Sequence, residues 1–375
     1  MARPHPGLER SLSAVRVSAK SRGREPILAV REIQMAELKN RQWLLAARPK
    51  GIIKESDFRW NETVVPPLKD GQVVVRNLAF SFDPTQRGWM SMDTYIPAIP
   101  VGQTMKAATV GQVVESKKPG FAKGDLVQGL FGWEDYTVSA GEGMMGLQQL
   151  PRGTDPILAL SLLGITGLTA YFGTLSVGAV KAGDTFVVSG AAGATGSVAG
   201  MIAKIKGCRV VGIAGGREKC DWLVKEAGFD AAIDYKNEKV GEALTKACPK
   251  GIDVYFDNVG GEILDDALAR LALGARIVLC GAISQYNNLG ERTPVGPKNY
   301  FNLLLFGARM EGFLVFHFAA RYPEAIGEMS KWLAEGKIKN QVDLQHGLEN
   351  APKTIIRLFT GANIGKQLLK VGDAQ

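Results

Sequence analysis

The pattern of apolar and polar positions changes character near residue 160. Between residues 40 and 140, short β-branched runs are interrupted by Gly, Pro and Asp, as in "NRQWLLAA", "GQVVVRNLAFSFDP", "ATVGQVVES" and "GDLVQGLFGWEDYTVS". Closely spaced runs of this kind are typical of strands joined by turns. The pattern therefore predicts a compact antiparallel barrel or sandwich in this part of the chain.

Beyond residue 160, short apolar runs alternate with helical patterns. The apolar runs are "DTFVVSGA", "CRVVGIAG", "AAIDY", "GIDVYFDNV", "ARIVLCGA" and "RMEGFLVF". This alternation predicts βαβ units and a Rossmann-type, doubly wound parallel sheet. Residues 322–371 add two amphipathic helical patterns and a closing strand, "GKQLLKV".

The predicted fold class is therefore α/β, with a Rossmann domain beside a β-rich domain. We place the β-rich catalytic domain at residues 35–160, completed by residues 326–375, and the nucleotide-binding domain at residues 161–325. No apolar run reaches the roughly 18 residues of a membrane span. The closest is residues 157–172, where Gly164 and Gly167 favour a core helix.

Composition fits a globular protein, with 46% apolar and 22% charged residues. The net charge of +8 is uneven, because residues 1–34 carry seven basic and three acidic side chains. The other +4 is spread over the rest of the chain, which is too dilute for a nucleic-acid groove. The predicted partner is a small molecule, and neither a nucleic acid nor a membrane is expected.

Residues 1–34 are rich in Arg and Ser and lack clear periodicity, which predicts a disordered extension. Three interpretations stay open: a disordered tail, a mitochondrial transit peptide, or sequence upstream of a natural start at Met35. A cytoplasmic location is expected, or a mitochondrial one if the second interpretation holds.

The cysteines and histidines show no metal-binding spacing. The four cysteines contain no C-x-x-C pair, and the three histidines lie far apart in sequence. Reduced, packed thiols of an intracellular protein are predicted, without a catalytic zinc.

The strongest motif is "DTFVVSGAAGATGSVAGMIAK", residues 184–204. An apolar strand leads into Gly190, Gly193 and Gly196, and a helical pattern begins there. Glycines at such a turn let a pyrophosphate approach the backbone N–H groups of a helix N-terminus. The spacing G-x-x-G-x-x-G thus predicts dinucleotide binding, and Gly200 predicts close packing of helix and strand.

The next strand indicates which dinucleotide binds. NAD-binding folds place an acidic residue at its end to hold the ribose 2′-hydroxyl. Here the strand ends in Ala214, Gly215 and Gly216, and Arg217 and Lys219 follow. Cations without a carboxylate suit a 2′-phosphate, so NADPH is the predicted cofactor. Lys219 by itself could also be a solvated lysine at a helix start.

The run "CGAISQY" follows a predicted parallel strand, at whose carboxyl end ligands bind. Tyr286 there could orient or protonate a substrate oxygen, which makes it the candidate catalytic residue. Packing in the wall of the site is the alternative.

Several motifs together resemble one family. They are the "AAGATGSVAGMIAKIKGCRVVGIAGGREKCDWL" run, "GFDAAIDYKN", "DVYFDNVGGEILDDAL", "RIVLCGAISQYN", "RMEGFLVF", "GANIGKQLLKV", "NRQWLLAARPKG" and "SFDPTQRGWM". They are similar to the zinc-independent leukotriene hydroxydehydrogenase/prostaglandin reductase family of medium-chain dehydrogenases/reductases, which includes alkenal double-bond and curcumin reductases. The resemblance spans about residues 38–371 and implies a GroES-like barrel for the β-rich domain.

The resemblance also implies roles for individual residues. The pyrophosphate would lie on residues 193–196, the 2′-phosphate beside Gly216, Lys219 and Tyr235, and the nicotinamide side near Asn258. The remaining implied contacts are Cys280, Gly281, Ala282, Ile283, Ser284, Gln285 and Tyr286 over the cofactor, Phe313, Leu314 and Val315 along the nicotinamide, and Asn363 closing the site; Ala194 and Thr195 complete the pyrophosphate set. A homodimer, formed through the edge strand near Phe313, is implied as well.

One departure from the family concerns the substrate. Many members read "DPYMR" where this chain has Asp83, Pro84, Thr85, Gln86 and Arg87. The loss of the tyrosine and methionine predicts a reshaped substrate pocket. Arg87 is either structural or steers an acidic substrate.

The predicted reaction is hydride addition from NADPH to the β-carbon of an α,β-unsaturated aldehyde or ketone, such as a 2-alkenal, a 15-oxoprostaglandin or a curcumin-like enone. Hydrogen-bond donors, Tyr286 among them, would stabilise the resulting enolate. An NADPH-dependent quinone oxidoreductase is the alternative enzyme. A non-catalytic NADPH-binding sensor or scaffold is the alternative of another class.

Overall fold

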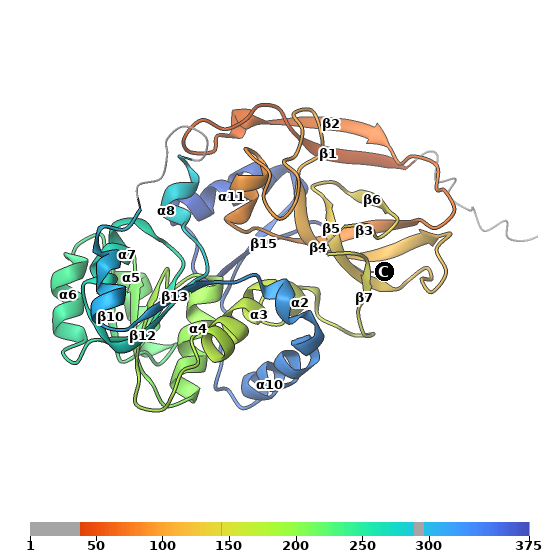
Figure 1. The fold of residues 1–375 in the computed structure, drawn as a ribbon. Coiled ribbons are helices and arrows are strands. Elements are labelled where there is room, and N and C mark those ends of the chain that lie inside the picture. Colours follow the sequence, from red (N-terminus) through yellow and green to blue (C-terminus); the bar gives the residue numbers. More distant parts are fainter. Residues whose placement is uncertain (1–37, 144, 289–295, 375) are drawn as a thin grey trace, which may run out of the picture. The chain divides into compact units, whose positions relative to one another are not determined.

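A computed structural model describes residues 38–143, 145–288 and 296–374. The predictions for residues 1–34 lie outside the described residues. Two sheets organise the described chain, a parallel one in the middle of the sequence and a largely antiparallel one built from both ends (Figure 1).

The parallel sheet confirms the predicted Rossmann-type domain. Its strands lie in the order β10-β9-β8-β11-β12-β13, so the chain runs outward from β8 in one direction and then outward from β11 in the other. Every neighbouring pair is parallel. The strands are β8 (Thr185–Ser189), β9 (Arg209–Ala214), β10 (Ala231–Asp234), β11 (Ile252–Asp257), β12 (Leu271–Leu279) and β13 (Arg309–Gly312).

Alternating side chains of these strands build a core on each face of the sheet. Phe186 and Val188 of β8 join one core, and Val187 between them joins the other. Burial on both faces explains why the strands read as continuous apolar runs. The helices around this sheet are α3 (Ile165–Phe172), α4 (Ala194–Ile205), α5 (Arg217–Lys225), α6 (Val240–Ala247), α7 (Gly261–Leu268), α8 (Ile283–Tyr286), α9 (Asn302–Leu305) and α10 (Tyr322–Ala334).

The second sheet forms the separate β-rich domain. It has the order β14-β15-β3-β4-β5-β7, with β6 also paired to β3. Its strands are β3 (Val73–Ser81), β4 (Lys106–Ser116), β5 (Leu126–Gly132), β6 (Tyr136–Ser139), β7 (Gln148–Gln149), β14 (Val342–His346) and β15 (Lys366–Lys370). A hairpin of β1 (Lys39–Leu45) and β2 (Phe58–Val64) accompanies it, as do helices α1 (Thr85–Trp89), α2 (Pro156–Leu160) and α11 (Ala351–Thr360).

The antiparallel pairing predicted for residues 40–140 is confirmed, while β14 and β15, which lie outside that range, pair in parallel. Two local features differ from the sequence prediction. The helix expected over residues 157–172 is broken into α2 and α3, with Ser161 and Gly164 in non-helical conformations between them. The strand expected over residues 309–316 ends at Gly312 and passes into a 3₁₀ helix, Val315–Arg321.

Helix α10 crosses the predicted domain boundary at residues 325 and 326. Ala325, Met329 and Trp332 pack in the same core as α3 and α4, as does Ile338 beyond the helix. The chain therefore stays on the nucleotide domain until just before β14, while the exact domain limits stay a prediction. Within the described residues, no helix is long and apolar enough to cross a membrane.

Candidate active site

One large cavity, of about 1280 Å³, runs between the two domains. The carboxyl ends of β8, β9 and β11 open onto one side of it, where parallel sheets bind ligands. The other side is formed by residues of the β-rich domain, among them Asp83, Thr85 and Tyr95. Residues of both domains thus line one cavity that includes the predicted nucleotide site.

The glycine turn after β8 is shaped for a close backbone approach. Gly190 has φ +58°, a conformation that favours glycine, and a Cβ at Gly196 would lie 2.4 Å from the Gly190 carbonyl oxygen. Helix α4 then begins with Gly193 as its N-cap, which offers no side chain to its first N–H groups. Those donors and the helix dipole suit a pyrophosphate. Gly193, Ala194, Thr195 and Gly196 all line the cavity.

Gly200 allows close packing of α4, but against Phe229 in the loop before β10 and not against a strand, as the sequence predicted. A Cβ there would stand 2.0 Å from the Phe229 ring, so only glycine lets α4 pack this closely.

The turn after β11 is held by a buried carboxylate. Asp257 accepts hydrogen bonds from Ser189 Oγ (2.8 Å) and from the Gly260 N–H (3.0 Å). Burial raises the pKa of Asp257, against the effect of these donors. The neighbouring Asn258 lines the cavity and donates its Nδ2 to the Ser189 carbonyl oxygen at 2.8 Å. The sequence interpretation of Asn258 as a turn residue is thus compatible with a place beside the cofactor.

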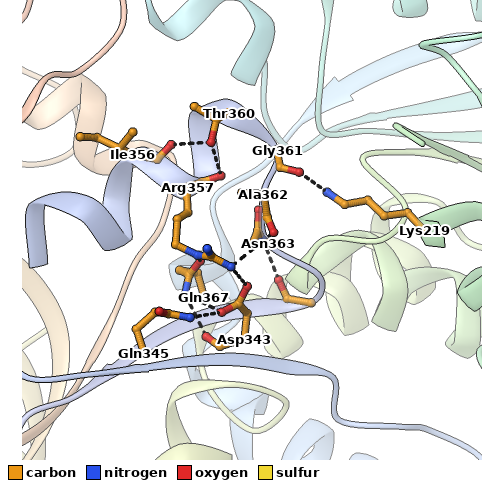
Figure 2. A network of polar contacts seen from close by, with 11 residues as sticks. Lys219, Asp343, Gln345, Ile356, Arg357, Thr360, Gly361, Ala362, Asn363 and Gln367 are labelled. Carbon is orange, nitrogen blue, oxygen red and sulfur yellow. Dashed lines mark hydrogen bonds and ion pairs between the residues drawn. The ribbon is translucent and has the colours of Figure 1, made fainter. Parts of the chain in front are cut away.

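Lys219 lines this cavity as well as a smaller one. Its Nζ donates to the carbonyl oxygen of Gly361, 2.8 Å away at the end of α11 (Figure 2). Burial, together with Lys236, lowers the pKa of Lys219. A lowered lysine pKa means that burial destabilises the ammonium more than nearby carboxylates stabilise it. A phosphate beside this ammonium would therefore be bound favourably. Tyr235 also lines the cavity, while Gly216 lines a smaller polar cavity that adjoins Lys219.

The acid at the end of the next strand, β10, is already hydrogen-bonded. Asp234 accepts from the Gly216 N–H at 2.7 Å and from Asn237 Nδ2 at 2.7 Å, and the Gly216 bond is the main cause that lowers the pKa of Asp234. It lies at the end of β10 and not of β9, where a ribose-binding acid would be expected.

The loop after β12 brings a phenol into the cavity. Tyr286 is partly buried at the end of α8, and its Oη accepts a hydrogen bond from the Ala282 N–H at 3.2 Å. Burial raises the pKa of Tyr286, so the phenol keeps its proton at neutral pH. Cys280 lines the same wall, and burial raises its thiol pKa to about 12. Of this loop, Ala282 alone among residues 280–286 does not line the cavity.

A second phenol was missed from the sequence. Tyr95 lines the cavity and shares a 2.8 Å hydrogen bond with Thr85 Oγ1. Burial is the main cause that raises the pKa of Tyr95, and ionisation of Tyr286 would raise it further. Tyr95 lies in an irregular segment without periodicity, so no sequence signal pointed to it.

Residues 313–315 do not line the cavity. Phe313 packs beside Phe318 and Val315 is buried in the core, while Leu314 is exposed. Phe316 lines the cavity instead, with its ring 5.9 Å from that of Tyr95, because the chain turns into a 3₁₀ helix here. The predicted contacts of residues 313–315 with the nicotinamide stay a prediction. Asn363 does line the cavity, and its Nδ2 donates to the Gly365 carbonyl oxygen at 3.0 Å.

Arg87 has a structural environment. It is fully buried and donates to the carbonyl oxygens of Pro49 (3.1 Å) and Gly51 (3.2 Å). A third contact, 3.5 Å to the Asn287 carbonyl oxygen, ties the β-rich domain to the loop that carries Tyr286. These contacts favour the structural interpretation over the steering of an acidic substrate.

In the described ranges 38–143, 145–288 and 296–374, no group of three or more His, Cys, Asp or Glu side chains is placed to hold a metal ion.

Comparisons with known proteins agree with this geometry. Residues 41–147 match a family profile described as the N-terminal domain of oxidoreductase, and residues 194–331 match one described as zinc-binding dehydrogenase. The chain is 42% identical to an NADPH-dependent curcumin reductase of Escherichia coli, over 89% of this chain and 98% of that protein. It is 41% identical to an NADP⁺-dependent 2-alkenal reductase of Nicotiana tabacum, over 89% and 98%.

A solved structure shows the same fold. The structure of CurA from Vibrio vulnificus in complex with NADPH matches with a TM-score of 0.83 and 41% identity, over 89% of this chain and 99% of that one. Identity of this extent over nearly whole chains establishes the family. The chain belongs to the zinc-independent medium-chain dehydrogenases/reductases of the leukotriene hydroxydehydrogenase/prostaglandin reductase type.

Proposed function

We propose that this protein is an NADPH-dependent reductase that adds hydride to the β-carbon of α,β-unsaturated aldehydes and ketones. One observation carries the proposal: the same cavity is lined by the glycine turn and Lys219 and by the two phenols Tyr286 and Tyr95. The reductases among its relatives, named for curcumin and for 2-alkenals, support this substrate class.

Residues of both domains would hold the cofactor. The uncapped start of α4 suits the pyrophosphate, and Lys219 with Tyr235 and Gly216 suits the 2′-phosphate. When bound, NADPH supplies the hydride. Asn258, Asn363 and residues 280–286 other than Ala282 would enclose its nicotinamide end.

The protein's own part in the reaction is to stabilise negative charge on the substrate oxygen. Because Tyr286 Oη accepts from the Ala282 N–H, its proton is directed to another acceptor. Thr85 can donate to Tyr95 Oη in the same way. Two phenols would thus donate to the carbonyl oxygen as the substrate becomes an enolate. One such donor typically lowers the activation free energy by about 3 kcal/mol.

The test is a labelling experiment with the purified protein. Deuterated NADPH is supplied with a short 2-alkenal, an aromatic enone and a quinone, and the products are identified by mass spectrometry and NMR. The expected result is a saturated carbonyl product that carries deuterium on the β-carbon. Deuterium on the carbonyl carbon, turnover of the quinone alone, or no consumption of NADPH would overturn the proposal.

We also propose a homodimer. Strand β13 lies at the edge of the described parallel sheet, and next to it in sequence η4 (Lys298–Phe301) and α9 expose large apolar side chains. Leu304 is 72% exposed and Tyr300 is 63% exposed, which is unusual for a surface without a partner. Sedimentation analysis should give a dimer for the wild type and a monomer for Leu304→Glu. Val64→Glu, at an exposed site on the β2 hairpin, is the control; a monomeric wild type would refute this proposal.

A further inference from the structure

A short segment of the β-rich domain spans the nucleotide end of the cavity. In this segment, residues 361–365, the Gly361 carbonyl oxygen accepts a hydrogen bond of 2.8 Å from Lys219 Nζ. At its other end, the Gly365 N–H donates to the Ala192 carbonyl oxygen at 2.8 Å, and Gly365 pairs with Gly193 as an isolated bridge. The 361–365 segment therefore touches both the lysine expected at the 2′-phosphate and the glycines expected at the pyrophosphate.

Arg357 holds this segment in place (Figure 2). Its Nη2 donates to the Ala362 carbonyl oxygen at 3.3 Å and to Asp343 Oδ2 at 2.6 Å. Its Nε donates to Gln367 Oε1 at 3.2 Å. One guanidinium thus connects α11, β14, β15 and the 361–365 segment.

Asp343 is itself fixed from several sides. Gln345 Nε2 donates to its Oδ1 at 2.6 Å, and Gln367 Nε2 donates to its backbone oxygen at 2.9 Å. The Asp343 side chain is 13% exposed and the Arg357 side chain 34%, so their ion pair is partly shielded from water on the Asp343 side. Burial alone would raise the pKa of Asp343, but the hydrogen bonds from Arg357, Gln345 and Gln367 and the charge of Arg357 together lower it.

The charge of this pair matters for a phosphate. Asp343 and Lys219 line the same small polar cavity, and Asp343 acts electrostatically on Lys219. An unpaired carboxylate there would repel a ribose phosphate, whereas the Arg357–Asp343 pair carries no net charge. The pair can therefore fix the 361–365 segment without repelling an anionic ligand.

We propose that Arg357 and Asp343 are positioning residues that set the preference for NADPH over NADH from the β-rich domain, by holding the 361–365 segment against Lys219. The inference rests on the proposed use of NADPH. It assigns these two residues no contact with the reacting atoms.

The test uses titration calorimetry of the full chain with NADP⁺ and with NAD⁺, for the wild type, Arg357→Gln, Asp343→Asn and the double variant. Arg357→Gln leaves a carboxylate without its cation, so NADP⁺ should bind about tenfold more weakly, which corresponds to 1.4 kcal/mol. NAD⁺ should change much less. The double variant removes the exposed charge and should regain part of the lost NADP⁺ affinity.

A merely structural role gives a different pattern. Equal losses for both nucleotides, or a double variant no better than Arg357→Gln, would overturn the inference. The matched control is Arg41→Gln, because Arg41 pairs with Asp135 at 2.8 Å in the same domain and neither residue lines the cavity. If Arg357→Gln does not fold, Arg357→Lys keeps the cation but loses the forked contacts, so it tests the hold on the 361–365 segment apart from the charge. An unchanged ratio of NADP⁺ to NAD⁺ affinity in Arg357→Lys would then overturn the inference.

The outcome for the proposed function is separate. A wild type that binds NADP⁺ but reduces no enone would refute the proposed reaction and leave this inference standing. Normal enone reduction with an unchanged nucleotide preference in the variants would refute only the inference.

Discussion

At the scale of single residues, the two phenols of the cavity are the groups on which the chemistry depends. Tyr286→Phe and Tyr95→Phe each remove one hydroxyl and keep the ring. Loss of one donor to an enolate should lower kcat about 100-fold, while the affinity for NADPH stays unchanged. Steady-state kinetics with a 2-alkenal checks this. Tyr136→Phe, on β6 and outside the lining of the cavity, should keep wild-type rates, and full activity of Tyr286→Phe would exclude its role as a donor.

The protonation of these phenols gives a second prediction at this scale. A free tyrosine ionises near pH 10, and burial raises the pKa of both Tyr286 and Tyr95 above that value. A donor must be protonated, so kcat should stay level from neutral pH into the mildly alkaline range and fall only above about pH 10. A pH–rate profile measures this. A decline near pH 8 would show that another group controls the reaction.

These residues also show what a sequence can reveal about a site. Tyr286 could be found because it follows a parallel strand, whose carboxyl end faces ligands. Tyr95 reaches the same cavity from an irregular loop, where nothing in the local pattern fixes the direction of a side chain. Phe316 was missed for a related reason, since the turn into a 3₁₀ helix after Leu314 changes which side chains face inward.

At the scale of elements, the turn between β8 and α4 is the most constrained part of the nucleotide site. In Gly196→Ala, the new methyl group would stand 2.4 Å from the Gly190 carbonyl oxygen, so the start of α4 must shift. We expect NADP⁺ affinity to fall by tenfold or more, about 1.4 kcal/mol, because the first N–H groups of α4 lose their alignment. Calorimetric titration measures the loss.

The matched control for this change is Gly327→Ala. Gly327 lies in α10, and a Cβ there meets nothing within 4 Å. Replacing a helical glycine without a clash should stabilise the protein by about 0.5–1 kcal/mol and leave nucleotide affinity unchanged. If the two variants bind NADP⁺ equally well, the close approach of backbone to pyrophosphate is not needed.

The elements themselves differ in how well the sequence predicts them. The strands of the parallel sheet are apolar on both faces, and so β8 to β12 are recognisable as runs. Strand β14 reads "VDLQH" and is only partly buried, so its pattern is too short and too polar to stand out. Its parallel pairing with β15 depends on tertiary contacts, among them those of Asp343 with Gln367, which no local pattern encodes.

At the scale of the whole molecule, the cavity is bounded by both domains, and few direct bonds join them there. Lys219 to Gly361, Gly365 to Ala192 and Arg87 to Asn287 are three such links. A dinucleotide that contacts both sides of the cavity would add links that exist only in the folded protein. Binding should therefore stabilise the two domains together.

The size of this effect follows from mass action. NADP⁺ at about 100 times its dissociation constant should raise the free energy of unfolding by about 2.7 kcal/mol. Thermal unfolding followed by circular dichroism should show one transition that moves to higher temperature, and NAD⁺ at the same concentration should move it less. Two transitions, of which NADP⁺ shifts only one, would mean that the domains unfold independently. In that case the 361–365 segment could not transmit nucleotide binding to the β-rich domain, because its contacts with Lys219 and Ala192 would be too weak to couple the two folds.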